Sequence, residues 1–441
     1  MAADPDKNNS GSAPPFSRGW LAFFVLSLLL GAVLRLSYSG DIEFKYDEAF
    51  MFSQTQTAGI SQPVPTLGME SSVGIRNPPL GIWVFLALSR LFSADTPPEL
   101  ARTVQILNIL ALAGLLGFAW RQVDPRIKEN WLWTMALVCV NPIAVLLQRK
   151  IWTQSTLPLF CLLFILGWSR RDRWGGALLW GFLGAWLGQI HLSGFFFAAA
   201  VVIWTTASRL LQKQSRAVAW GPWAIGSILG SLTMVKWLHY YFQLEHRHYL
   251  IEFVLNWSNH PLFHTLFWQL WVSDPLGLGL SYSLGNYQFL DYLEYPLVGG
   301  QPTYLMVAAH LVILGLAGLA IYRLLARAWR TPVSWENVIL GKPGSDTQLL
   351  LTATFFGYGM LLTLNGMLIP CHYLITTFPL EWLWWVVLFR QAFPAAVLRK
   401  ALAALWICLL ILSAGFLGYI HVNHGAQTGD YGVSFKHQLG N

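Results

Sequence analysis

The chain has 441 residues, of which 55% are hydrophobic and only 11% are charged. A soluble protein carries about 25% charged residues, so the composition excludes an ordinary soluble enzyme. The net charge of +7 does not point to nucleic acid, because in a membrane protein the placement of the bases matters more than their sum. The four cysteines have neither metal-ligand spacing nor the pattern of a disulfide framework.

Apolar segments follow one another along the chain, and most approach the 20 or so residues that cross a bilayer as a helix. They lie at residues 19–38, 79–93, 101–121, 131–148, 152–168, 175–191, 194–212, 220–243, 302–322, 347–369, 372–389 and 401–420. The fold class predicted from this pattern is an all-α polytopic membrane protein with about 11 transmembrane helices.

The sidedness depends on segment 79–93, which is short for a span. If this segment lies in the interface, most of the 28 bases fall in loops on one side, which the positive-inside rule then makes cytoplasmic. If it spans, most of those basic loops move to the outer side. We therefore expect it to be interfacial, with the N-terminus in the cytoplasm and the C-terminus outside.

This topology divides the chain into five parts. We expect interfacial helices in both large outer loops, because Trp, Tyr and acids alternate there with apolar residues. The parts are a disordered cytoplasmic leader 1–18, a membrane module 19–243 with its first outer loop at 39–100, an outer loop 244–301, C-terminal membrane helices 302–420, and an outer tail 421–441.

Ionisable residues cluster in the first outer loop, around Asp47 and Glu48. Side chains of neighbouring residues on a helix point about 100° apart, so we expect two separate roles for this pair. A carboxylate that takes a proton from a hydroxyl must lie close to the reacting atoms and be partly shielded from water. The alternative is a group of solvated loop acids without a function.

The surrounding motif, Tyr46-Asp47-Glu48-Ala49, resembles the Asp-Glu motif of GT-C glycosyltransferases. The resemblance is to the branch that contains protein O-mannosyltransferases and lipid A aminoarabinose transferase. Four later elements are similar to that branch in order and spacing: Asn77-Pro78-Pro79-Leu80 before Trp83, Arg102, Asn141-Pro142 followed by Arg149, and Cys371-His372-Tyr373 before Phe378-Pro379.

Two departures from the pattern concern the site. Asn77 replaces the usual His or Lys before the prolines, and Gln154 or Ser155 stands where a second acid is common. These departures put in doubt a second-loop carboxylate and any metal dependence like that of oligosaccharyltransferases. No cofactor is expected, and a divalent metal stays open.

The resemblance implies a transferase that moves a sugar from a polyprenyl phosphate to an acceptor hydroxyl, with inversion, at the outer (periplasmic) face. Asp47 would be the general base, and Glu48 would orient the acceptor or a neighbouring cation. The implied partners are the lipid-phosphate donor, the bilayer, and a glycan, lipid or protein acceptor. The implied location is a bacterial inner membrane.

Two further sets of residues are candidates by position. The alternative for each is interfacial anchoring or a structural hydrogen bond. Candidates for holding the donor phosphate are Arg76, Arg102, Arg149, Lys150, His372 and Tyr373; candidates for acceptor or sugar contact are Tyr46, Glu70, His191 and Tyr292.

Two other classes of function compete with this interpretation. A transporter or flippase of a lipid-linked saccharide predicts repeat symmetry and several charged residues near mid-membrane, and these are scarce apart from Glu381 and Lys236. A structural assembly partner predicts that the acidic cluster tolerates substitution.

Overall fold

The computed structural model describes most of the chain, and nearly all of the predicted leader 1–18 lies outside the described part. His260 and His264, from the outer loop 244–301, also fall outside it. The described residues are 18–71, 75–121, 123–125, 127–212, 216–243, 245–246, 248, 265–330, 334–364 and 369–438.

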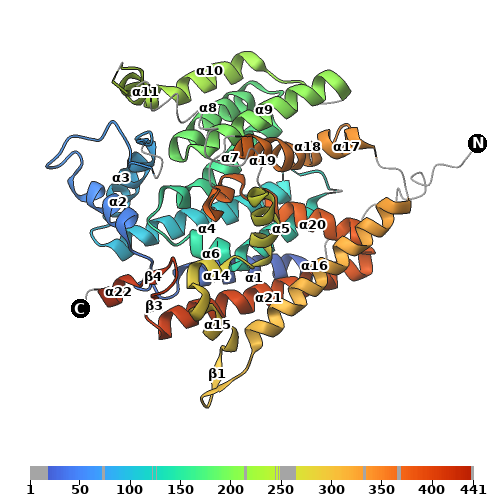
Figure 1. The fold of residues 1–441 in the computed structure, drawn as a ribbon. Coiled ribbons are helices and arrows are strands. Elements are labelled where there is room, and N and C mark those ends of the chain that lie inside the picture. The colour runs from blue at the N-terminus through green and yellow to red at the C-terminus, as the bar shows by residue number, and fades with distance from the viewer. Residues whose placement is uncertain are drawn as a thin grey trace, which may run out of the picture.

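In the described residues the protein is built of helices, with two short hairpins (Figure 1). The first half contains α1 (Arg18–Leu36), α2 (Tyr46–Thr57), α3 (Leu80–Phe92), α4 (Pro97–Arg121), α5 (Lys128–Val140), α6 (Pro142–Leu147), η2 (Thr153–Thr156), α7 (Leu157–Ser169), α8 (Trp174–Ile190), α9 (Ser193–Gln212), α10 (Trp220–Ser231), η3 (Leu232–Met234) and α11 (Val235–Phe242).

The second half begins with the helices of the large outer loop and ends with a short tail. It contains α13 (Leu266–Ser273), η4 (Asp274–Leu276), α14 (Leu280–Leu284), α15 (Asn286–Glu294), β1 (Leu297–Val298), β2 (Gln301–Pro302), α16 (Leu305–Arg330), α17 (Trp335–Leu340), α18 (Asp346–Thr352), η5 (Ala353–Tyr358), α19 (Gly359–Leu364), η6 (Cys371–Thr377), α20 (Leu380–Ala392), α21 (Ala395–Val422), β3 (Gly425–Ala426), β4 (Gly432–Val433) and α22 (Phe435–Gln438).

Six helical segments in the described residues are long and apolar enough to cross a membrane, by length and composition. The other predicted spans are shorter or interrupted helices, such as α5 with α6 and α10 with α11. The predicted class, an all-α polytopic membrane protein, is confirmed. The six segments are α1, α4, α9, α16, α21 and the run α18–η5–α19.

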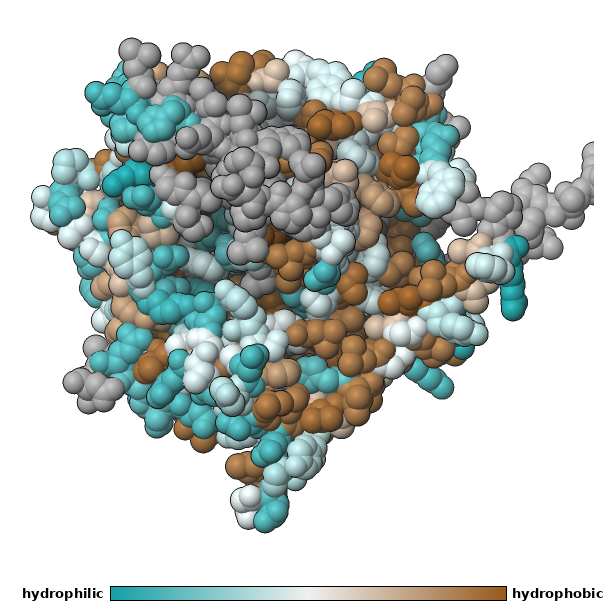
Figure 2. All heavy atoms as spheres, viewed as in Figure 1, coloured by the Kyte–Doolittle hydropathy of each residue, from teal (hydrophilic) through white to brown (hydrophobic). Residues whose placement is uncertain are grey.

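The apolar surface of α16 is exposed along most of the helix. Leu311, Leu314, Leu319 and Leu325 are all exposed, and Figure 2 shows apolar side chains gathered over this part of the molecule. Burying such a surface in lipid removes it from water. The opposite side of α16 packs on α21, and the two helices run side by side in Figure 1.

Helix α5 forms the centre of the bundle. It is apolar on all sides, and every residue from Asn130 to Val140 is buried. A helix that is hydrophobic all round must be covered on all faces. The helices α1, α4, α20 and α21 supply that cover.

The break between α5 and α6 arises from Asn141-Pro142. Pro142 has no N–H to offer the carbonyl of Val138, four residues earlier. The guanidinium of buried Arg35 takes its place, donating to the carbonyls of Val138 (3.2 Å) and Cys139 (2.9 Å). The Asn141 side chain caps α6 by accepting from the Ala144 N–H (2.9 Å).

The loop 39–100 contains two helices, α2 and α3, that are too short to span a bilayer. At 13 residues, α3 is about 20 Å long, against a hydrocarbon core of about 30 Å. It packs on α2, α4 and α8 rather than standing alone. Its length and packing agree with the expected interfacial position of residues 79–93.

The C-terminal tail packs against the start of this loop, next to α2 (Figure 1). The Phe435 N–H donates to the Ile42 carbonyl (3.0 Å), and the Lys436 N–H donates to the Gly40 carbonyl (3.1 Å). The hairpin β3–β4 pairs Gly425 with Val433. The tail therefore joins the first outer loop beside the predicted acidic cluster.

Glu381 lies differently from the prediction. The apolar run 372–389 suggested a single span with this acid near its middle, but η6 occupies residues up to Thr377 and α20 begins at Leu380. Glu381 is therefore in the first helical turn, where a carboxylate interacts favourably with the helix dipole. It is buried and accepts from Thr377 Oγ1 (2.9 Å).

Candidate active site

A cavity of about 340 Å³ opens beside the N-terminus of α2. Its walls come from five stretches of the chain: the loop 39–100, α6 with the following turn, the α14 region, the η6 region, and the tail. The charged and polar residues that line it are Glu43, Lys45, Tyr46, Asp47, Glu48, Lys150, Trp152, Tyr282, Ser283, His372 and Asp430.

The start of α2 is held by a one-sided cap, in which the Glu48 side chain bonds to the Lys45 backbone. Glu48 Oε2 accepts from the Lys45 backbone N–H (2.9 Å), which is the Glu half of a capping box. Asp47 lies between them in the first turn and is half-buried, while Tyr46 is 78% exposed. The predicted divergence of the two acids is observed, because Glu48 is buried and only Asp47 remains partly open.

Asp47 is held by Trp152, which lies before η2. The indole Nε1–H of Trp152 donates to Asp47 Oδ2 (2.9 Å). The same ring contacts two other groups of the cavity: Lys150 Nζ lies 4.8 Å from its centroid, and the His372 ring packs edge-on at 4.6 Å. Trp152 thus organises the carboxylate, a cation and a histidine around one rigid side chain.

Two lysines share one buried carboxylate in this cavity. Glu43 is 3% exposed, and its carboxylate pairs with Lys45 Nζ through Oε1 (2.6 Å) and with Lys150 Nζ through Oε2. Lys45 Nζ also lies 3.2 Å from Asp430 Oδ1. Burial lowers the pKa of Lys45, but Glu43 and Asp430 more than offset this and raise it. Lys45 is therefore a cation at neutral pH.

The carboxyl of Glu48, unlike the Lys45 ammonium, is shifted toward its neutral form. Burial raises the pKa of its carboxyl to about 7, and the nearby Glu43 adds to the rise while Lys150 opposes it. A carboxyl with a pKa near 7 changes its protonation state within the physiological range.

The histidines near the cavity are neutral at pH 7. Burial, together with His191 and Lys150, lowers the pKa of His372 well below its usual range. Burial alone lowers the pKa of His191 to about 4. The His191 ring packs edge-on against Tyr373 (4.7 Å) and lies 5.7 Å from the His372 ring. His372 can thus serve as a hydrogen-bonding group but not as a permanent cation.

The structure does not bring all predicted residues to this cavity. Arg149 points away and is buried, donating to the carbonyls of Leu34 (2.7 Å) and Tyr38 (3.2 Å). Tyr292 is fully buried, and its hydroxyl donates to the Leu412 carbonyl (2.9 Å).

Three more predicted residues have exposed side chains that do not line the cavity. The strand-like bridge between Glu70 and Arg76 lies in the loop between α2 and α3. Arg102 is exposed on the first turns of α4. Tyr46, Asp47, Glu48, Lys150 and His372 are the predicted residues that the cavity collects.

The charged and hydrogen-bonding residues Glu43, Lys45, Trp152 and Asp430 are among the lining residues that were not predicted as site residues. Glu43 and Lys45 belong to the cluster that drew attention to the loop, so a signal was present for them. Trp152 follows the predicted Arg149 and Lys150 at an outer junction, but Trp is common at interfaces. Asp430 lies in a short polar tail that carries no motif.

No three His, Cys, Asp or Glu side chains gather as possible metal ligands anywhere in the part of the chain that the structure describes. The acids of the cavity are instead bonded to the side chains of Lys45, Lys150 and Trp152 and to the backbone at the start of α2.

No family model and no curated protein matches the chain, but several solved structures are similar to it. The oligosaccharyltransferase AglB from Archaeoglobus fulgidus, in complex with an inhibitory peptide and a dolichol-phosphate, has a TM-score of 0.48 and 13% identity, covering 90% of this chain and 55% of AglB. ArnT from Cupriavidus metallidurans, bound to undecaprenyl phosphate, has a TM-score of 0.47 and 14% identity, covering 91% of this chain and 76% of ArnT.

The chain spans about half the length of the oligosaccharyltransferase that it matches. With TM-scores below 0.5 and identities below 15%, these likenesses carry no argument about function.

Proposed function

We propose that this protein is a membrane glycosyltransferase of GT-C type, which moves a sugar from a polyprenyl-phosphate donor to an acceptor hydroxyl. The observation that supports it most is the position of Asp47. Its carboxylate is half-buried, is held by Trp152, and shares a cavity with two lysines. This is the pairing that the reaction needs: a base for the acceptor and cations for a phosphate.

In the reaction, the acceptor oxygen forms a bond to the anomeric carbon while its proton passes to the Asp47 carboxylate. The bond between that carbon and the phosphate oxygen breaks, and the electron pair leaves with the polyprenyl phosphate. Displacement from the opposite face inverts the anomeric configuration. No general acid is required, because a phosphate is already a good leaving group.

Lys45 and Lys150 would balance the charge of the departing phosphate. In the free protein both are paired with Glu43, which holds their ammonium groups in position. Lys45 is also 40% exposed, so its ammonium can reach a ligand without unfolding the loop. Neutral His372 can donate one N–H to a phosphate or sugar oxygen.

The proposed face is the outer one, in a bacterial inner membrane. Its support is the convergence of the stretches around residues 47, 150, 372 and 430, which the charge distribution puts on the non-cytoplasmic side. Ile143, Leu146 and Leu147 of α6 give the cavity an apolar wall, which suits the first isoprenoid unit of such a donor. The acceptor, whether glycan, lipid or protein, is set by contacts beyond these residues.

The test is consumption of defined donors by the purified full chain in detergent. A panel of undecaprenyl-phosphate and dolichyl-phosphate sugars is incubated with a membrane-glycolipid extract, and release of the polyprenyl phosphate is followed by mass spectrometry. We expect release with at least one donor, dependent on the acceptor extract. Absence of release across the panel would contradict the proposal.

The same donors separate the rival transporter from the transferase. In proteoliposomes, a flippase moves the intact lipid-linked sugar between leaflets without breaking the bond to phosphate. We expect no movement of intact donor above that of empty liposomes. Movement with the bond intact, and no product, would assign the protein to the rival class.

A further inference from the structure

A second and larger cavity, of about 500 Å³, lies between the start of α5 and the end of α7. Trp131 on the first turn of α5 and Ser169 at the end of α7 both line it. The loops around it were predicted to be cytoplasmic. Its inner wall is apolar, formed by Phe118, Val123, Ile127, Trp131, Ile165, Trp168 and Leu350.

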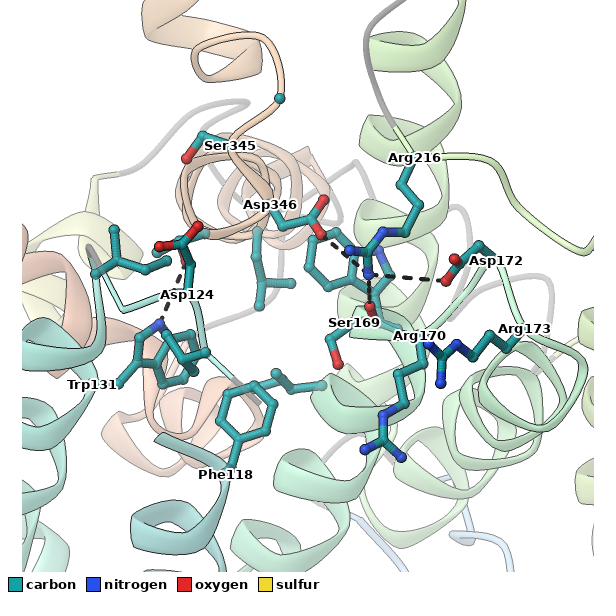
Figure 3. Close-up of a pocket in the computed structure, with 17 residues that line it drawn as sticks. Phe118, Asp124, Trp131, Ser169, Arg170, Asp172, Arg173, Arg216, Ser345 and Asp346 are labelled. Carbon is teal, nitrogen blue, oxygen red and sulfur yellow. Dashed lines mark hydrogen bonds and ion pairs between the residues drawn. The ribbon is translucent and has the colours of Figure 1, made fainter. Parts of the chain in front are cut away.

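One side of this cavity carries three arginines. Figure 3 shows Arg170, Arg173 and Arg216 together on that side, with Asp124 and Trp131 across from them. The first two come from the turn between α7 and α8, and Arg216 precedes α10. Three planar guanidinium groups at one wall present several N–H donors in a geometry that suits phosphate oxygens.

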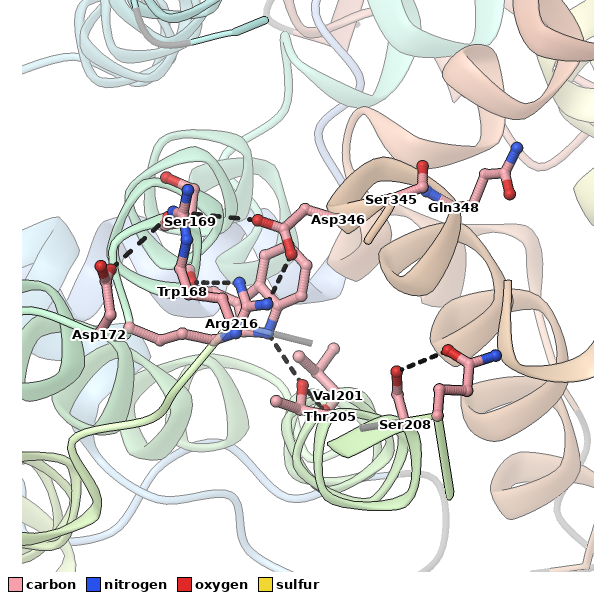
Figure 4. Close-up of polar contacts among 12 residues, drawn as sticks. Trp168, Ser169, Asp172, Val201, Thr205, Ser208, Arg216, Ser345, Asp346 and Gln348 are labelled. Atoms are coloured by element: carbon pink, nitrogen blue, oxygen red, sulfur yellow. Dashed lines mark hydrogen bonds and ion pairs between the residues drawn. The ribbon is translucent and has the colours of Figure 1, made fainter. Parts of the chain in front are cut away.

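Asp346 lines the cavity near the arginines, but its carboxylate is already paired with Arg171. Asp346 Oδ1 accepts from the buried guanidinium of Arg171 (2.5 Å), which also stacks on the Trp168 ring at 4.3 Å. Figure 4 shows Asp346 reaching toward Trp168 from the α18 side. The charge of Asp346 is thus largely balanced by Arg171, and Asp172 is the other acid beside the arginines.

Arg216 is only loosely paired. Its NH1 group donates to the Ser169 carbonyl, but lies 3.9 Å from carboxylate oxygens of both Asp172 and Asp346. Charge-assisted hydrogen bonds are about 2.7–2.9 Å long, so neither acid forms one with it. Arg173 is exposed and has no side-chain partner among the described residues.

We propose that this cavity binds a phosphate ester attached to an apolar group. Arg173 and Arg216 bind the phosphate oxygens, and the aromatic wall around Trp131 and Trp168 receives the apolar part. The positive-inside rule alone would spread arginines over all cytoplasmic loops. The three arginines described above instead line one cavity together with Trp131 and Trp168. A lipid headgroup and a soluble phosphate ester share this chemistry. The proposal is independent of the sugar-transfer reaction at the first cavity.

Binding to the purified full chain in detergent tests the proposal, with dissociation constants from titration. The lipid probe is dioctanoyl phosphatidic acid, the soluble probe is glycerol 3-phosphate, and dioctanoylglycerol is the uncharged control. The test variant is Arg173→Gln with Arg216→Gln. A charge-matched control, Arg209→Gln with Lys400→Gln, removes two exposed bases that do not line the cavity.

We expect at least one phosphate probe to bind, and the test variant to weaken its binding by about 100-fold, or about tenfold for each charged hydrogen bond removed. The control variant should change it by less than about threefold. Tighter binding of the lipid than of glycerol 3-phosphate assigns the site to a headgroup, and equal binding assigns it to a free ester. If the test variant does not fold, Arg173→Gln alone should still weaken binding.

Three results would overturn the assignment. These are no binding of either phosphate probe, equal loss in the test and control variants, and binding of dioctanoylglycerol as tight as that of phosphatidic acid. Substitutions at Asp47 should leave this binding unchanged, so failure of the transferase proposal and failure of this one are distinguishable.

Discussion

The indole N–H of Trp152 donates to the Asp47 carboxylate at 2.9 Å, across 105 positions of sequence. Asp47 belongs to α2 and Trp152 to the turn between α6 and η2, so the bond ties together two walls of the cavity. It engages Oδ2, while Oδ1 has no protein donor among the described residues. One oxygen is thus anchored and the other is left for a substrate hydroxyl.

Replacing Trp152 by Phe tests whether this bond positions the base. The substitution keeps an aromatic ring but removes the donor. Because a hydrogen bond to a charged group contributes about 1.5–3 kcal/mol, we expect kcat to fall about 10- to 100-fold with little change in the KM for the donor. Trp204→Phe, which removes a bond to the Ile339 carbonyl far from the cavity, should leave both constants near wild type. A rise in KM without loss of kcat would contradict the positioning role.

The paired lysines lead to a prediction about donor binding. Lys150→Met removes a buried cation while keeping most of the side-chain volume. We expect the KM for the donor to rise at least tenfold, because the phosphate loses a charged contact, and the KM for the acceptor to stay within about threefold. Lys236→Met removes an exposed lysine of α11 and serves as the control. Equal effects of the two variants on donor KM would show that Lys150 is not a specific phosphate ligand.

The raised pKa of Glu48 predicts how stability depends on pH. Its carboxyl titrates near 4.5 when unfolded and near 7 when folded, so the folded state binds the extra proton between these values. Its contribution to stability is therefore fully present below pH 4.5 and is lost as the pH rises to 7, by about 3 kcal/mol from this group.

Thermal unfolding in detergent from pH 5 to pH 8 measures this effect. The melting temperature of the wild type should fall as the pH rises toward 7 and then level off. Glu48→Gln, which cannot ionise, should have a smaller slope over the same interval. An unchanged slope in the variant would mean that Glu48 is not the group responsible.

Tyr431 connects the tail to the segment before α2. Its buried hydroxyl donates to the Asp41 carbonyl (2.6 Å), and Tyr431→Phe would leave that carbonyl without this donor, at a cost of about 1–3 kcal/mol. We expect faster proteolytic cleavage of the tail and a lower melting temperature. Tyr287→Phe, at a residue that is 78% exposed, should change neither. Equal cleavage in all three proteins would contradict the predicted docking.

Much of the fold class could be predicted, because an apolar run long enough to cross a bilayer has few other stable forms. The site was predicted in part. Asp47, Glu48, Lys150 and His372 stand at ends of apolar segments on the same predicted side, so sidedness alone brings them near one another. Lys150 faces the cavity and the adjacent Arg149 does not. This choice depends on the geometry of the turn after α6, and a hydropathy pattern does not predict turn geometry.

Two features of the structure could not be predicted from the hydropathy pattern of the sequence. Asp430 reaches Lys45 across 385 positions, a pairing that follows from how the tail packs rather than from any local signal. Glu381 was expected near mid-span because its segment is continuously apolar, yet the chain forms η6 before α20 begins. Apolar composition indicates burial but does not define where a helix starts.

The most direct test of the account is the transfer rate of Asp47→Asn with saturating donor. The amide keeps the size of the carboxylate but cannot accept the acceptor proton, and general-base catalysis contributes about 10²–10⁴-fold. We predict a loss of at least 100-fold in kcat, with donor binding and melting temperature close to wild type, while Asp95→Asn on the exposed α3–α4 turn remains active. An Asp47→Asn protein that transfers sugar at the wild-type rate would contradict the account.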